Sequence, residues 1–210
     1  MSQIKLKHSG GNSVIIAAPD SNPASDRTLK LPSDGDGTIL TTNSSVGKIL
    51  QIVQTVKTDT FSFAASATGN TSGGVSGAAI SASITPSSTS NKVLIRGVLT
   101  VSPSSNNRIG IVIYADGTEI SGSTGDAAGS RSRVATGGQL TNGFTAQHLM
   151  LGHEFLHSPS STSSVTYSYR LVNLDSTASR TLYLNRGAGD SDVAHHFRST
   201  SIITLEEVAA

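Results

Sequence analysis

The sequence predicts an all-β protein, made of an N-terminal anchor of short strands followed by an antiparallel β-sandwich of the jelly-roll type. Apolar residues alternate with polar or small ones over short stretches, which is typical of half-buried strands. Clusters of Gly, Pro, Asn, Asp and Ser separate these stretches at regular spacing, as in sandwiches and jelly rolls. No stretch has a convincing helical pattern, and the length of 210 residues fits one large all-β domain with an appendage.

Residues 1–46 differ from the rest of the chain because the strands expected there are very short. They cover residues 4–7, 14–18, 27–31 and 38–40. Strands of this length cannot bury a core by themselves. We therefore expect this segment to be an anchor that docks on a partner chain or winds together with identical chains. The apolar side chains of the anchor are Ile4, Leu6, Val14, Ile15, Ile16, Leu29, Leu31, Ile39 and Leu40.

Residues 47–210 carry longer strands and form the expected sandwich domain. The pair Asp116-Gly117 predicts a tight hairpin, because both residue types tolerate the positive φ that a two-residue turn needs. The expected strands cover residues 48–58, 78–84, 93–101, 108–115, 118–121, 165–174, 181–185 and 198–208. The expected loops cover residues 64–77, 122–133, 158–164 and 186–194.

The stretch 77–102 is expected to be a hairpin of two neighbouring strands. Its first strand alternates small or apolar residues with polar ones, and Pro86 ends it because proline lacks the N–H that the ladder needs. Its second strand, 93–101, is rich in β-branched residues. Small side chains allow close packing, so we predict that the first strand lines a subunit interface through Ala78, Ile80, Ala82 and Ile84.

The composition limits the partners that the protein can have. Charged residues make up 14% of the chain and apolar residues 36%, which is low for a self-sufficient core, so we expect a homo-oligomer, in the first place a homotrimer. A net charge of +1 with scattered Lys and Arg argues against nucleic-acid binding. Cysteine is absent, and no apolar run has the ~20 residues of a membrane-spanning helix. The first ten residues also lack the apolar region of a signal peptide.

Several blocks of the sequence resemble a known class of proteins. The block LKHSGGNSVIIAAP…RTLKLPSDGDGTILTTNS resembles the attachment or shaft segments of tailed-bacteriophage fibres. The blocks GKILQIVQTVKTDTFS, SITPSSTSNKVLI, RIGIVIYADG and STSIITLEEVA resemble the C-terminal β-sandwich heads of such proteins, especially those of marine cyanobacterial phages. The resemblance covers nearly the whole chain and rests on strands and turns, not on a chemical motif. It implies a fibre or decoration protein whose head is similar to the trimeric jelly rolls of tumour-necrosis-factor and complement-type domains, with inner sheets meeting at a three-fold axis.

The sharpest chemical motif is HEFLH at residues 153–157, an HExxH sequence. On a helix, the two histidines would share a face and bind zinc, with the glutamate as the base of a metalloprotease. Gly152 and the strand-like flanks favour a strand instead, in which the Cα atoms of His153 and His157 lie about 13 Å apart. We therefore expect no metal and no catalytic residue here, and the metalloprotease stays a remote alternative.

Three other clusters are weaker still. His195 and His196, near Asp190, could hold a metal where copies meet at a three-fold axis, although a solvated loop is the simpler interpretation. Residues 34–38, which overlap the acidic turn 33–37, resemble the start of a calcium loop, but the twelfth position is Ser45 and not a glutamate. Glu206 and Glu207 would point to opposite faces of a strand, which does not suit acid–base chemistry on one bond.

Together these observations predict a non-enzymatic structural protein of a phage virion, made in the host cytoplasm and without a cofactor. The favoured form is a trimeric capsid decoration or head-fibre knob, anchored to other virion proteins by residues 1–46. The alternative is a tail fibre or receptor-binding tip, whose loops contact a glycan or protein of the host surface.

Overall fold

The computed structural model describes residues 3–7, 9–11, 13–17, 48–67, 74–105, 107–141 and 145–210. The chain divides into two compact units, Met1–Asn43 and Ser44–Ala210. Every regular element in the described ranges is a strand, so none of them contains a helix of the length and apolar character that crossing a membrane requires.

In the first unit, β1 (Gln3–Lys7) and β2 (Ser13–Ala17) form an antiparallel pair. Gly11 lies in the link between them with a φ of +98°, a conformation that glycine adopts without a steric penalty. The two expected strands at 4–7 and 14–18 are thus confirmed. The expected strands at 27–31 and 38–40, with Leu29, Leu31, Ile39 and Leu40, lie outside the described residues, as does the acidic turn 33–37.

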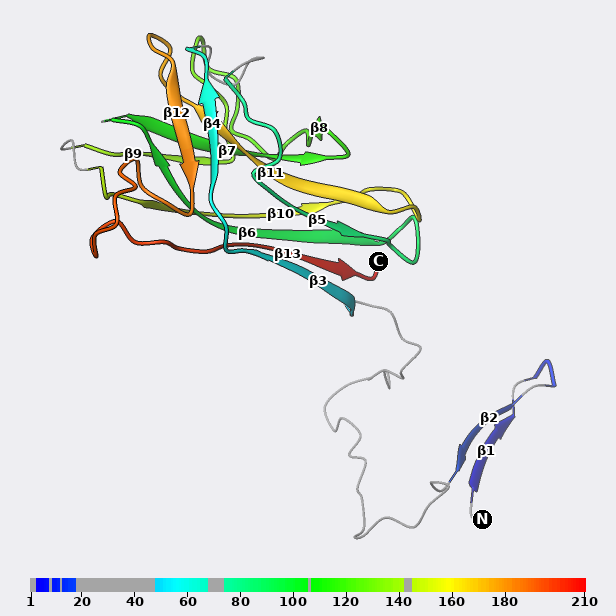
Figure 1. Ribbon diagram of the computed structural model, residues 1–210. Helices are drawn as coiled ribbons and strands as arrows, with labels where there is room; N and C mark the ends of the chain where they lie inside the picture. The colour runs from blue at the N-terminus through cyan, green and yellow to red at the C-terminus, as the bar shows by residue number, and fades with distance from the viewer. Residues whose placement is uncertain are drawn as a thin grey trace, which may run out of the picture. The chain divides into compact units, whose positions relative to one another are not determined.

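The second unit is a sandwich of two antiparallel sheets, which confirms the predicted fold class (Figure 1). The first sheet has the order β3 (Ile49–Lys57), β13 (Ser201–Val208), β6 (Lys92–Pro103), β12 (Arg180–Leu184) and β4 (Phe61–Ala65), and β10 (Leu149–His157) pairs with β6. The second sheet has the order β5 (Ile80–Ile84), β11 (Val165–Asn173), β7 (Arg108–Ala115) and β8 (Thr118–Glu119), and β9 (Thr136–Gln139) pairs with β7.

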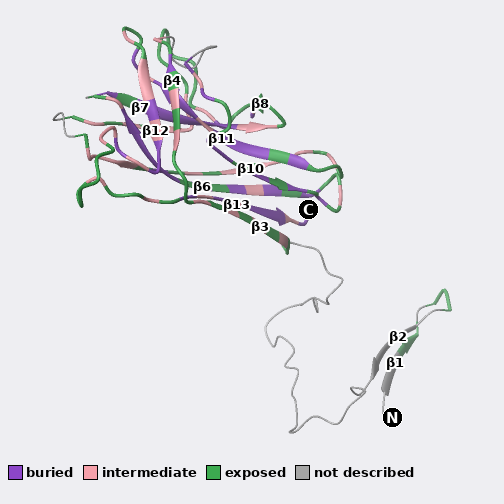
Figure 2. Ribbon diagram, viewed as in Figure 1, coloured by how far each residue is buried: buried purple, intermediate pink, exposed green. Residues whose placement is uncertain are grey.

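The core lies between the two sheets and is built from every second residue of the long strands (Figure 2). On β6, the side chains of Val93, Ile95, Leu99 and Val101 are all fully buried. This alternation follows from strand geometry, because successive side chains point to opposite faces of a sheet. The largest fully buried side chains include Tyr167, Tyr169, Ile109, Ile111, Ile113, Leu171, Leu182, Leu184 and Ile203.

The hairpin predicted at 77–102 is wrong in its pairing. β5 pairs with β11, whereas β6 pairs with β13 and β10, so the link between β5 and β6 crosses from the second sheet to the first. An alternating pattern tells which face of a strand is buried, but not which sheet the strand joins. Glu207 on β13 holds this link: its Oε1 accepts hydrogen bonds from Ser87 N (2.7 Å), Ser87 Oγ (2.8 Å) and Asn91 Nδ2 (2.6 Å).

The predicted subunit interface on β5 is also wrong for three of its four residues. Ile80, Ala82 and Ile84 point into the chain's own core and are at most 7% exposed. Their side chains are covered by the opposite sheet, so they have almost no surface left for a second subunit. Ala78 precedes β5 and is exposed, and it stays an untested candidate.

The other strands follow the prediction with two omissions. The hairpin turn at Asp116-Gly117 is confirmed: both residues have positive φ, +47° and +81°, and Ala115 pairs with Thr118 across the turn. β4 and β9 were not predicted; the sequence of β4 overlaps the loop expected at 64–77, and β9 is short and contains Gly137 and Gly138. The last strand begins at Ser201, three residues later than expected.

Candidate functional site

The HExxH motif lies on β10, in an extended strand. His153 and His157 both point toward the second sheet, where His157 Nδ1 lies 2.8 Å from Tyr167 Oη and the Tyr169 hydroxyl donates to the His153 carbonyl at 3.1 Å. Glu154 points to the other face, 3.6 Å from Arg96. A metalloprotease needs both histidines on one metal with the glutamate beside them. The strand separates all three groups, as its spacing predicted.

These two histidines are instead part of the packing between the sheets. The rings of His153 and Tyr169 pack edge to face, with their centroids 6.1 Å apart. The rings of His157 and Tyr167 pack in the same way, with their centroids 5.6 Å apart. Burial lowers the pKa of both histidines, because the charged form loses its hydration. Burial also raises the pKa of both tyrosines above its usual range. The neutral forms of all four side chains therefore suit the folded state.

The second metal candidate, around His195 and His196, is a loop in which one ring nitrogen already has a hydrogen-bond partner. His196 Nδ1 accepts a hydrogen bond from the N–H of Ser191 at 3.0 Å. The nearby carboxylate of Asp190 binds two guanidinium groups, Arg186 at 3.1 Å and Arg198 at 2.5 Å. In the part of the chain that the structure describes, no three His, Asp or Glu side chains gather as a metal site would require.

The paired carboxylates of β13 point to opposite faces, as predicted. Glu206 faces outward and binds Arg96 Nη1 at 2.8 Å. Glu207 faces the core, where burial favours a raised pKa but hydrogen bonds from Gln51, Asn91 and Ser87 outweigh it and hold the pKa below its usual range. Gln51 Nε2 donates to its Oε2 at 2.6 Å. Glu207 thus ties β3, the link after β5 and β13 together, and this role was not predicted.

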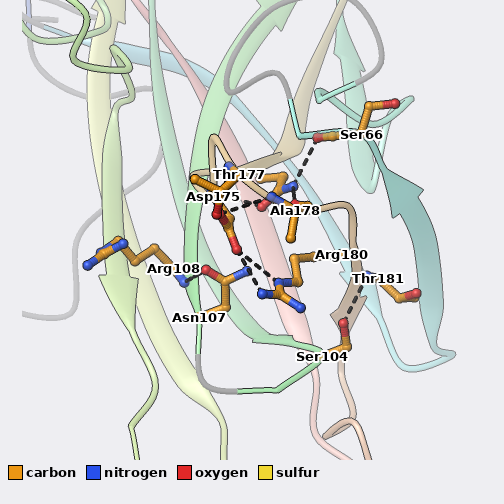
Figure 3. Close-up of polar contacts among 10 residues, drawn as sticks. Ser66, Ser104, Asn107, Arg108, Asp175, Thr177, Ala178, Arg180 and Thr181 are labelled. Atoms are coloured by element: carbon orange, nitrogen blue, oxygen red, sulfur yellow. Dashed lines mark hydrogen bonds and ion pairs between the residues drawn. The ribbon is translucent and has the colours of Figure 1, made fainter.

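A polar cluster around Asp175 was also missed by sequence reasoning (Figure 3). One carboxylate oxygen of Asp175 accepts from the N–H and hydroxyl of Thr177 (2.9 and 2.7 Å) and from the N–H of Ala178 (3.2 Å). The other oxygen binds Arg180 Nε at 3.0 Å. The hydrogen bonds from Thr177, together with Arg180, hold the pKa of Asp175 far below its usual range. Both oxygens are thus used to close the loop between β11 and β12, a local turn that Asp before Ser and Thr favours.

Within residues 48–210, the two outer faces of the sandwich differ in how many large apolar side chains they expose. On the second sheet, Val112 and Val172 point outward and yet are fully buried. A Cβ at the neighbouring Gly110 would meet Val134 and Leu174, and the Ala135 N–H donates to the Ile111 carbonyl at 2.9 Å. The polar loop after β8 therefore lies against this sheet around Gly110.

Within the part of the chain that the structure describes, the outer face of the first sheet exposes large aliphatic side chains on β3, β6 and β10. Much of β3 has the colour of exposed residues in Figure 2. We call this surface the aliphatic face and define it by five residues with their exposed fractions: Ile52 (62%), Val56 (49%), Val98 (45%), Met150 (75%) and Leu156 (47%).

The strand register arranges the aliphatic face in rows that cross β3, β13, β6 and β10. One row is apolar and contains Val56, Ile202, Val98 and Gly152. The next row is polar and contains Gln54, Thr204, Arg96 and Glu154. The third row contains Ile52, Glu206, Leu94 and Leu156. Arg96 binds both Glu206 and Glu154, so the charges in the middle of the face are already paired within the chain.

Comparisons with known proteins found similarity in structure only. No protein-family model matches the sequence, and the search of curated proteins found no match. The chain is similar to a structure of the infectious bursal disease virus Gx strain (TM-score 0.39, 18% identity) and to the VP2 subviral particle of that virus (TM-score 0.39, 19% identity). Each alignment includes 94% of this chain. It includes 46% of the first viral chain and 47% of the second, so this chain spans a little under half of their length.

Proposed function

We propose that this chain is a non-enzymatic structural protein of a virus particle, namely a trimeric capsid decoration or head-fibre protein. In this proposal residues 1–46 attach to other virion proteins, and the sandwich forms the head. The observation that carries the proposal is the aliphatic face, a surface suited to contact with protein rather than to chemistry.

The aliphatic face is unusual for a sheet that faces water. In an antiparallel sheet with one solvated side, polar residues normally alternate with the buried ones. Here Ile52, Val98 and Met150 take outward positions instead. Burying apolar surface contributes about 25 cal/mol per Å², and contiguous exposed patches usually mark contact sites. A protein surface packed on this face is therefore the arrangement that the sequence favours.

The assignment to a virion rests on the sequence resemblance to tailed-bacteriophage fibres, in both the anchor and the sandwich. The competing metalloprotease is disfavoured by a specific observation: Glu154 and the two histidines lie on opposite faces of β10. Zinc measured in the purified protein provides a check, because stoichiometric metal would contradict this interpretation.

Particle incorporation tests the proposed function. Particles assembled with the full chain are compared with particles assembled with residues 47–210, and both are labelled with antibodies against the sandwich. We expect label on the capsid for the full chain and none for the truncated chain. Label on the tail would favour the receptor-binding alternative, and incorporation of the truncated chain would contradict the anchor.

A further inference from the structure

We propose that the aliphatic face is the surface through which one copy of this chain packs on another copy. The inference rests on the proposed function and deepens it, because it names the partner and the residues of the contact. It replaces the interface expected on β5, whose apolar side chains are already used in the chain's own core.

The size of the face fits a subunit contact. It spans the four adjacent strands β3, β13, β6 and β10. Four strands about 4.8 Å apart and about eight residues long, at about 3.3 Å per residue, cover a plane of about 500 Å². A standard interface buries about 800 Å² of accessible surface on each partner, and accessible surface exceeds the flat footprint because side chains project from it. One sheet face of this chain is thus of the order of one interface side.

The charges of the face fit a copy of itself better than a charged partner. The outward side chains of its four strands include two positive groups, Lys92 and Arg96, and two negative groups, Glu154 and Glu206. The face is therefore neutral, and a nucleic acid or an anionic membrane gains no long-range attraction from it. Two copies of a neutral face meet without net repulsion.

The row pattern is self-complementary as well. A polar row that contains the paired Arg96 lies between two rows that expose aliphatic side chains. Where copies of this face meet around the three-fold axis of the proposed trimer, apolar rows can pack on apolar rows, and the ion pairs of the middle rows face groups of both signs. The described strands of the opposite sheet offer no comparable surface, because none of their large apolar side chains is exposed.

The test measures the mass of the purified full chain by sedimentation at micromolar concentrations. The wild type is expected to form an oligomer. The double variant Ile52→Lys/Val98→Lys places charges in the apolar rows, so we expect the dissociation constant of the oligomer to rise at least about tenfold. Val193→Lys is the matched control, since Val193 is 44% exposed, against 45% for Val98, but lies in a loop away from the face. Near-ultraviolet circular dichroism of the buried tyrosines verifies that each variant is folded.

An oligomer that dissociates in the double variant and persists in Val193→Lys supports the proposal. A monomeric wild type, or a double variant that stays fully assembled, overturns it. Particle incorporation of the full chain is scored separately: if the chain fails to enter particles, the proposed function fails whatever the mass in solution is.

Discussion

Gly97 on β6 faces the core at a position where only a hydrogen fits. A Cβ there would meet Cε2 and Cζ of the Tyr169 ring, which lies directly against the backbone of β6. Gly97 therefore allows the largest side chain of the opposite sheet to pack closely, and this explains a glycine in the middle of a β-branched strand.

We expect Gly97→Ala to lower the free energy of unfolding by about 1–3 kcal/mol, because the buried ring must move. Denaturant unfolding at a fixed protein concentration measures the change. Gly77→Ala is the control, because nothing lies within 4 Å of its added Cβ. Equal stability of Gly97→Ala and the control would show that the ring does not pack on β6 as described.

Glu207 is a buried carboxylate that fastens the link between the two sheets. Replacement by alanine leaves the donors of Ser87, Asn91 and Gln51 without their acceptor. Unsatisfied buried donors cost about 1–3 kcal/mol, so we expect Glu207→Ala to destabilise the sandwich by about 2–3 kcal/mol. Asp126→Ala, at an exposed loop position, is the control and should change stability little. A loss no greater than that of the control would argue against this role.

At this scale, sequence reasoning found the strand β6 from its β-branched residues, but it did not find the role of Glu207. The β-branched residues of this strand include Val93, Ile95 and Val101, which all lie at odd positions of the sequence. A carboxylate is seldom fully buried, so Glu207 gives no local signal of its burial. Its hydrogen-bond partners lie 116 or more residues away in the sequence, and only the fold brings them together.

Among the strands, β10 gives the protein a pH dependence. Burial lowers the pKa of His153, His157 and the nearby loop residue His148. Each group therefore binds its proton more readily in the unfolded chain, where the pKa is about 6.5. The free energy of unfolding should fall as the pH drops from about 6.5 through the lower pKa values of the folded state.

We expect the double variant His153→Gln/His157→Gln to lose part of this dependence between about pH 7.5 and about pH 5.5. Glu207 and Asp175 do not interfere in that range, because their lowered pKa values make stability fall only in more acidic solution, below about pH 4.5. Urea unfolding at both pH values measures the effect, with His195→Gln as a control at an exposed position. An identical pH dependence in wild type and double variant would contradict the assignment.

The strand pairing was the least predictable property of the elements. The tight turn at Asp116-Gly117 was found because its residues have a specific backbone preference. The link between β5 and β6 was taken for a hairpin, because Pro86 and the serines after it end a strand without specifying where the next strand goes. β9 was missed, since its two glycines carry no alternating pattern.

The aliphatic face had a signal in the sequence that was not used. Residues 48–58 carry apolar side chains at both odd and even positions, and the same holds for 93–101 and 149–157. A strand that is apolar on both faces usually has neither face in water. Three such strands in one sheet indicate a covered outer face, but only the register shows that Ile52, Val98 and Leu156 share it.

For the whole molecule, we expect the stability to depend on protein concentration. An oligomer that forms only from folded chains shifts the equilibrium toward the folded state, so the melting temperature should rise with concentration. Scanning calorimetry over a hundredfold range of concentration measures this. In Ile52→Lys/Val98→Lys the dependence should weaken or vanish, and a wild-type melting temperature independent of concentration would speak against assembly.

The most direct measurement for the central claim is a reconstruction of the virus particle at a resolution that shows strands. We expect density for the sandwich on the outside of the capsid, with copies in contact through β3, β13, β6 and β10 and residues 1–46 joined to the particle. A particle without this chain, or a sandwich whose aliphatic face is open to solvent, would contradict it.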